Sequence, residues 1–298
     1  MQFGKLDYIP SPWQDPTLDS FRFLFTATKR SKPLTVYLGT PRLPDASWVG
    51  PVFPKGTRRK DFLKNYLERF NTFELNASFY GINPRTFELF AEQMVPDFKL
   101  SVKLPQSITH YRRLEGYEEV LDRLLTVVEP LHANLAPTLA QLPENMKADR
   151  LARIQRFIST YPHDLPLALE FRHPDFFEPV LFSELMHLLA EHKRTAVITD
   201  TPGKRHVLHT YFTAPTAFIR FNGTGDPAFD KQRLLHWLGL CYEMQQYGME
   251  VVYFMIHESD PILGVQLIEA MRAEIQHRND HRVVSPIQGS AQQQTLFG

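Results

Sequence analysis

The chain has a single cysteine, Cys241, among its 298 residues, so no disulfide can form within it. No apolar run is long enough to cross a membrane, and no basic segment leads into an apolar block at the N-terminus. A lone thiol suits a reducing compartment. We therefore expect a cytoplasmic protein without a membrane partner.

Charge of one sign is also missing, because 33 basic side chains balance 33 acidic ones. The chain as a whole therefore produces no field that would draw it onto nucleic acid. Basic side chains do cluster locally, at 55–60 and at 110–113. The hydrophobic content of 43% is ample for a large core.

Apolar segments of strand length alternate with helical patterns along most of the chain. We predict strands at Thr35–Leu38, Thr72–Asn76, Lys99–Lys103, Asn134–Gln141, Leu167–Phe171, Ala196–Thr199, Ala217–Phe221 and Glu250–Ile256. Segments with apolar residues three and four apart, the pattern of a helix, lie between the strands, except at 201–210, where no helix is indicated. Eight such units in about 240 residues predict an α/β fold, a closed (β/α)8 TIM-like barrel.

A doubly wound open sheet is the alternative, but no glycine-rich turn follows the first strand. We divide the chain into an N-terminal extension wrapped on the barrel (1–33), the barrel (34–280) and a flexible tail (281–298). Pro10, Pro12 and Pro16 interrupt the extension, and Ser, Pro, Gly and Gln dominate the tail.

Polar side chains gather at the predicted strand ends, which all meet at one face of such a barrel. As catalytic residues we predict Glu74, Lys103, Glu170, His173 and Asp200. As substrate-binding residues we predict Asn76, Tyr80, His110, Gln141, Arg172, Arg220, Asn222, Gly223 and His257. Acids, cations and imidazoles at one mouth would shift one another's pKa values. The alternative for any single residue is an ordinary ion pair.

Two of these strand ends carry more specific signals. Glu170 and Arg172 project from the same side of a strand, and with His173 they could supply a base, an anion clamp and a proton carrier. The loop at 220–226 has two glycines that could turn backbone N–H groups inward to hold a phosphate. A structural Glu–Arg pair and an ordinary turn are the alternatives.

Residue types that bind metal ions are present, but their spacing is not typical of a metal site. Glu74, Glu170, Asp200, His173 and His257 could each donate an oxygen or a nitrogen. No pair of them has the His-x-x-x-His spacing of a helical metal site. We assign no metal and leave the cofactor unknown.

Ordered motifs over residues 35–275 resemble the YecE-like proteins, the family called domain of unknown function 72. The matches are Gly39, Trp48 with Gly50, Phe53–Gly56, Phe70–Tyr80, Phe98–Lys103, Ile108–His110, Arg113–Leu114, Gln141–Pro143, Glu170–Pro174, Asp200–Pro202 and Arg220–Gly223. The resemblance implies a TIM-like barrel and no particular reaction. The family often has paired asparagines before the position of His257 and a histidine at Asn222, and this chain departs from both.

The C-terminal segment resembles the short peptides by which bacterial proteins dock on the replication sliding clamp. Its candidate contacts are Gln293, Leu296 and Phe297, two apolar side chains for a pocket and a glutamine for its rim. The alternative is a Leu–Phe pair that folds back on the barrel.

The sequence favours an enzyme that acts on an anionic, phosphate-bearing substrate, such as a hydrolase of phosphodiesters in nucleic acid repair. Glu170 or Glu74 would be the base, and Arg220 would stabilise charge. On this hypothesis Glu170→Gln and Arg220→Ala abolish turnover and leave the fold intact. A sugar hydrolase or isomerase with a Glu74–Glu170 pair, and a non-catalytic adaptor on the clamp, are the alternatives.

Overall fold

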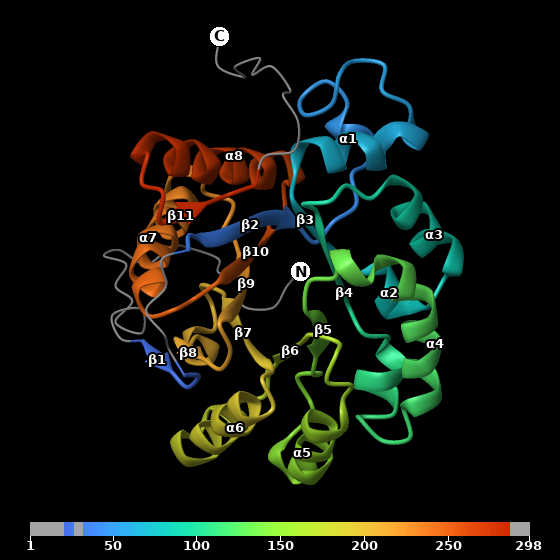
Figure 1. The fold of residues 1–298 in the computed structure, drawn as a ribbon, viewed down its shortest axis with the longest axis vertical. Coiled ribbons are helices and arrows are strands. Elements are labelled where there is room, and N and C mark those ends of the chain that lie inside the picture. Colours follow the sequence, from blue (N-terminus) through green and yellow to red (C-terminus); the bar gives the residue numbers. More distant parts are fainter. Residues whose placement is uncertain (1–20, 27–31, 287–298) are drawn as a thin grey trace.

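A ring of parallel strands with helices outside it forms the protein, as Figure 1 shows for a computed structural model that describes residues 21–26 and 32–286. The ring strands are β2 (Leu34–Thr40), β3 (Thr72–Leu75), β4 (Lys99–Val102), β5 (Thr138–Gln141), β6 (Leu167–Glu170), β7 (Thr195–Asp200), β9 (Thr216–Asn222) and β10 (Val251–His257). Each pairs with the next, and β10 pairs with β2. Two isolated bridges, Leu100 to Leu135 and Lys103 to Leu139, join β4 to β5. The TIM-like (β/α)8 fold is confirmed.

Helices follow most of the strands and cover the outside of the ring (Figure 1). They are α1 (Phe62–Arg69), α2 (Ala77–Tyr80), α3 (Pro84–Gln93), α4 (Glu118–Val128), α5 (Leu151–Thr160), α6 (Pro179–Glu191), α7 (Pro227–Gln246) and α8 (Pro261–Arg278). Short helices are η2 (Ala46–Trp48), η3 (Arg59–Asp61), η4 (Ser107–Tyr111), η5 (Glu129–Asn134), η6 (Ala148–Arg150), η7 (Pro174–Phe177) and η8 (Arg205–Val207). As predicted, β7 is followed only by η8 and the short β8 (Tyr211–Phe212).

Local sequence sets the start of the long helices. Asn83, Asp226 and Asp260 each accept a hydrogen bond from a backbone N–H of the first turn, and a proline follows each of them. A short polar side chain satisfies an otherwise unpaired donor, and proline supplies a helical φ where no N–H is needed.

Apolar side chains fill the lower part of the barrel interior. Tyr37, Leu139, Val197, Phe218 and Tyr253 lie there, and the rings of Tyr37 and Tyr253 stack with centroids 5.0 Å apart. The opposite faces of the same strands pack on the helices, because side chains alternate along a strand. Polar interior residues therefore occupy the carboxyl ends of the strands, where the barrel opens.

Gly39 on β2 permits close contact with β3. A Cβ at this position would lie 2.1 Å from the Thr72 carbonyl oxygen. Gly39→Ala must therefore move backbone against backbone, and we expect it to lower the free energy of unfolding by about 1–3 kcal/mol. Denaturant unfolding measures this.

Gly239→Ala is the matched control, because a Cβ there would meet nothing within 4 Å. In the interior of α7 this change should stabilise by about 0.5–1 kcal/mol. Equal stabilities for the two variants would contradict the contact between β2 and β3.

The chain ends depart in part from the predicted boundaries. β11 (Val283–Val284) pairs with β2, and Val283 is only 2% exposed. The prediction of a flexible tail from residue 281 is therefore wrong for Val283 and Val284. In the N-terminal extension, β1 (Arg22–Phe23) pairs with β8, so these residues do lie against the barrel.

Asn134 ends η5 and donates to the Val95 and Phe98 carbonyls, so the strand predicted from Asn134 begins four residues later, at Thr138.

Over residues 21–26 and 32–286, no helix has both the length and the apolar character needed to cross a membrane.

Candidate active site at the barrel mouth

Arg220 on β9 joins two glutamates at the carboxyl end of the barrel. Its Nε and Nη2 donate to the two carboxylate oxygens of Glu74 on β3, each at 2.9 Å. Its Nη1 donates to Glu170 Oε2 on β6 at 2.7 Å. All three side chains are completely buried. The prediction that these strand ends converge is confirmed.

Further side chains extend the arrangement from Glu170. Arg172 Nε donates to Glu170 Oε1 at 2.7 Å, and Gln141 Nε2 donates to Glu170 Oε2 at 2.9 Å. The other end of the Gln141 amide accepts from Lys103 Nζ at 2.9 Å. On the far side of Arg220, Asn76 Nδ2 donates to Glu74 Oε1 at 2.9 Å. We call these seven residues, Glu74, Asn76, Lys103, Gln141, Glu170, Arg172 and Arg220, the mouth network.

The two carboxylates of the mouth network stay ionised. Burial by itself raises the pKa of both, but the cations more than offset it. Arg220 leaves the pKa of Glu74 well below its usual value, and Arg172 with Arg220 lowers the pKa of Glu170 to about 2. Both carboxylates already accept hydrogen bonds from cations, and neither can donate a proton near neutral pH, so Glu74 and Glu170 fix geometry and charge.

Lys103 is the member of the network best suited to give up a proton. Burial and the nearby charge of Arg220 lower its pKa to about 8. Its Nζ lies 4.4 Å from the centroid of the Phe79 ring, which keeps water from one side. An ammonium group with this pKa can both stabilise an anion and donate a proton to a leaving group.

His257 and Asn222 lie beside each other at the same level of the mouth, because β10 and β9 pair them in register. Burial, and then Arg220, lower the His257 pKa to about 4, so its imidazole is neutral. Its Nε2 is 3.8 Å from Glu74 Oε2, beyond hydrogen-bonding distance. Within the described chain, neither His257 Nε2 nor Asn222 Nδ2 has a hydrogen-bond partner.

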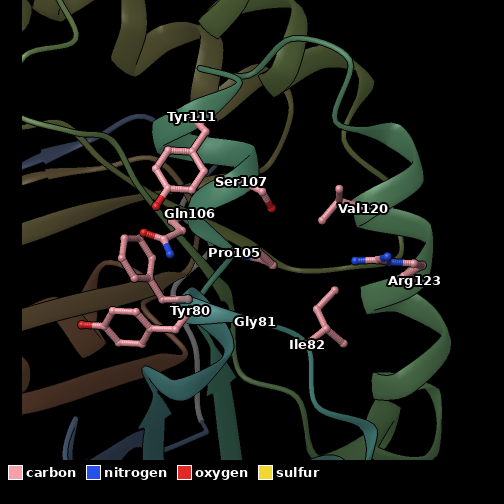
Figure 2. A pocket seen from close by; sticks show the side chains of 10 residues that line it. Tyr80, Gly81, Ile82, Pro105, Gln106, Ser107, Tyr111, Val120 and Arg123 are labelled. Carbon is pink, nitrogen blue, oxygen red and sulfur yellow. The ribbon is translucent and has the colours of Figure 1, made fainter.

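The rim next to Lys103 is aromatic. His110 on η4 meets the Phe79 ring edge to face with centroids 4.8 Å apart. Burial and the charge of Lys103 lower the His110 pKa to about 4. Tyr80, the next residue after Phe79, turns outward and lines a cleft beside η4 with Tyr111 (Figure 2).

Asp200, which we predicted to be catalytic, does not belong to this site. Val197 faces the barrel interior, so the side chain of Asp200, three residues later on β7, points outward to α7. There Asp200 accepts from Arg233 Nη2 at 2.7 Å and from Trp237 Nε1 at 2.7 Å, and it pairs with Arg205. Asp200 therefore anchors a helix to the barrel.

His173, the predicted proton carrier, contacts the short helix that follows it. Its Nδ1 accepts a hydrogen bond from the backbone N–H of Asp175 at 3.2 Å and so caps η7. The preference of the residue before a proline for extended backbone places His173 at this cap. Its contact is therefore with the following helix and not with the mouth network.

The glycine-rich loop at 220–226 forms the predicted concavity, but the protein fills it with its own carboxylate. Asp230 Oδ2 accepts from the backbone N–H groups of Thr224 at 2.7 Å and Gly225 at 3.0 Å. Gly223 N donates to the His257 carbonyl at 2.9 Å. The predicted phosphate site at this loop is therefore wrong. Gly223 instead leaves room for the Glu258 carboxyl, which lies 1.6 Å from where a Cβ would stand.

Several residues that make these contacts were not predicted from the sequence. Asp230, Arg233 and Trp237 share one face of α7 at a spacing of three and then four residues, and this helical spacing could have identified them. Glu258 carried no such signal. Burial and the charge of Asp230 raise its pKa to about 8.

No three His, Cys, Asp or Glu side chains within the described ranges are grouped so that they could hold a metal ion. Three of the five candidate metal ligands are instead paired with arginines: Glu74 and Glu170 bind Arg220, and Asp200 binds Arg233. Gln293, Leu296 and Phe297, the predicted clamp contacts, lie outside the described residues.

The fold and its polar mouth define a (β/α)8 barrel protein with a charged site at the carboxyl ends of the strands. The family model described as "Protein of unknown function DUF72" matches residues 37–293. The chain therefore belongs to the DUF72 family, in agreement with the motifs.

Curated relatives and solved structures agree with this assignment. The UPF0759 protein YecE of Escherichia coli (strain K12) is 22% identical over an alignment of 282 positions that covers 88% of this chain and all of the relative. The UPF0759 protein YunF of Bacillus subtilis (strain 168) is 29% identical over 51% of this chain and 56% of its own. A DUF72 family protein from Thermotoga maritima MSB8 has a TM-score of 0.62 at 26% identity, covering 82% of this chain and 99% of that one. Another from Enterococcus faecalis V583 has a TM-score of 0.65 at 17% identity, with 82% and 98% covered.

Proposed function

We propose that the barrel mouth binds and turns over an anionic, phosphate-bearing substrate. The observation that carries this proposal is the charge of the mouth network. Arg172, Arg220 and Lys103 supply three positive charges against two from Glu74 and Glu170, an excess of one. Asn222 Nδ2, a buried donor without a partner, needs an acceptor oxygen, and a phosphate oxygen provides one.

The roles differ from those inferred from sequence. Arg220 is completely buried between two glutamates, so it organises the site and does not meet the substrate. Lys103 and Arg172 bind the anion. The neutral His257 imidazole accepts a proton from the attacking water as its oxygen bonds to phosphorus. The ester oxygen leaves with its bonding electrons and takes a proton from Lys103.

Nucleic acid in a repair context is one form of this substrate. The tail motif at 293–297 favours that setting, since docking on a sliding clamp would bring the enzyme to DNA. Clamp docking, and with it the adaptor alternative, stays a prediction.

The sugar-processing alternative has one observation in its favour and one against it. Glu74 and Glu170 both bind the guanidinium of Arg220, so their separation falls within the about 10 Å limit for paired glycoside hydrolysis. That chemistry requires one protonated carboxyl group, and the lowered pKa values keep both ionised near neutral pH. We therefore favour the phosphate ester.

Lys103→Met tests the proposal. We expect thermal stabilisation of the wild type by inorganic phosphate, nucleotides or oligonucleotides, and calorimetry should give roughly 10- to 100-fold weaker binding for the variant. Lys99→Met is the matched control, because Lys99 lies at the opposite end of β4 and donates to the Ala133 carbonyl. It should bind as the wild type does.

His257→Gln separates binding from chemistry. It should keep the affinity of the wild type for the same compound and lose most of the turnover, by roughly 10²–10⁴-fold. Absence of binding of any phosphate compound to the wild-type protein would overturn the proposal.

A further inference from the structure

A cleft with exposed aromatic walls lies beside the mouth and takes no part in the mouth network. Its volume is about 210 Å³. It is bordered by α2 and the residues after it, by η4 and by α4, and Figure 2 shows Tyr80 and Tyr111 on one side with Ile82 and Arg123 across from them. Ligand pockets usually measure about 300–1,000 Å³, so this cleft suits one ring of a larger ligand.

The two tyrosines are far more exposed than such side chains usually are. Tyr80 is 77% exposed and Tyr111 is 72% exposed. Both stand on short, tight elements, the four-residue α2 and the π-helical turn η4, which present the rings to solvent. Exposed aromatic faces next to a cationic site are the usual platform for stacking nucleobases.

Phe79 connects the cleft to the mouth. Its ring lies under Lys103 Nζ at 4.4 Å and also lines the cleft, and its centroid is 5.3 Å from that of Tyr80. A ligand whose phosphate reaches Lys103 therefore carries its adjoining group past Phe79 into the cleft.

Polar groups in the cleft match the edges of a base. Gln106 presents an amide, Ser107 a hydroxyl and Arg123 a guanidinium. Among residues 21–26 and 32–286, no acid forms an ion pair with Arg123. An amide and a guanidinium can each form paired hydrogen bonds with a base edge.

We propose that this cleft is a stacking subsite for the nucleobase of a nucleotide whose phosphate occupies the mouth. The inference rests on the proposed function and narrows the substrate class to nucleotide units, either free or in a single strand. Tyr80 and Tyr111 stack on the base, and Gln106 with Arg123 contacts its edge.

Calorimetry with five probes tests the proposal: inorganic phosphate, deoxyribose 5-phosphate, deoxyadenosine, dAMP and a single-stranded octamer of deoxyadenosine. The wild type should bind dAMP more tightly than deoxyribose 5-phosphate. Tyr80→Ala and Tyr111→Ala should each weaken dAMP binding roughly 5- to 100-fold and leave phosphate binding unchanged. Tyr80→Phe, which keeps the ring, should restore the affinity.

Tyr247→Ala is the control, because Tyr247 is also an exposed tyrosine, 53% exposed, and lies just after α7. It should bind all probes as the wild type does. Tighter, salt-dependent binding of the octamer than of dAMP would identify the ligand as single-stranded nucleic acid. Equal binding of the two would identify it as a free nucleotide.

The outcomes separate the two proposals. If phosphate binds but dAMP binds no more tightly than deoxyribose 5-phosphate, the stacking subsite is overturned and the mouth proposal stands. If deoxyadenosine without phosphate binds and depends on Tyr80 while phosphate does not bind, the mouth proposal is overturned and the subsite stands.

Discussion

Arg220→Met is expected to lower the free energy of unfolding by about 3–5 kcal/mol at neutral pH, one of the two largest losses we predict. The change leaves Glu74 and Glu170 as buried carboxylates without the cation to which both now accept hydrogen bonds. Removing one partner of a buried ion pair costs the desolvation of the charge that remains. The sequence led us to expect an intact fold after Arg220→Ala, and the complete burial of this side chain reverses that expectation.

The loss should depend on pH in a defined direction. In the wild type the pKa values of both glutamates are lowered, so their contribution is present above the unfolded-state pKa of about 4.3 and is lost as the pH falls through the folded-state values. In the variant the same carboxylates resist ionisation. The difference between the two proteins should therefore be largest at pH 7–8 and shrink toward pH 5, as measured by denaturant unfolding.

Arg194→Met is the matched control for this pH dependence. Arg194 is also buried, but it donates to backbone carbonyls, including those of Pro162 and Tyr161. Its loss should destabilise the protein by a similar amount at pH 5 and pH 7.5. A flat pH profile for Arg220→Met would show that the two glutamates are not the source of its effect.

Asp200→Ala should produce a loss of similar size, about 3–5 kcal/mol, for a different reason. The carboxylate accepts from Arg233 and Trp237 and pairs with Arg205, so its removal leaves two cations near each other without their shared anion. Thermal unfolding measures the loss.

Ligand binding distinguishes this structural role from the catalytic one predicted from sequence. Below its unfolding transition, Asp200→Ala should bind a phosphate ligand at the mouth as tightly as the wild type does. Glu88→Gln, which removes an exposed partner of Arg85, should leave the unfolding midpoint unchanged. Loss of phosphate binding by folded Asp200→Ala would show that Asp200 contributes to the site at the barrel mouth.

Much of the fold could be predicted because its signals are local and repeated. Each strand is a short apolar run, each long helix shows apolar residues three and four apart, and their alternation implies parallel pairing. Parallel pairing places the strand ends at one face, so the meeting of Glu74, Glu170 and Arg220 could also be predicted. The tyrosines of the cleft were recognised only in part, since Tyr80 was predicted and Tyr111 was not.

The sequence by itself determined which elements form and which strand ends share the mouth, because hydrophobic periodicity and strand direction are properties of the chain. Tertiary structure decided which way each polar side chain faces and what it meets. A one-residue step along β7 turned Asp200 outward to Arg233, and Asp230, in the first turn of α7, filled the loop predicted to hold phosphate. Tertiary structure also decided the protonation of Glu74 and Glu170. Both are held ionised in a buried site by a shared guanidinium, an arrangement that the sequence does not show.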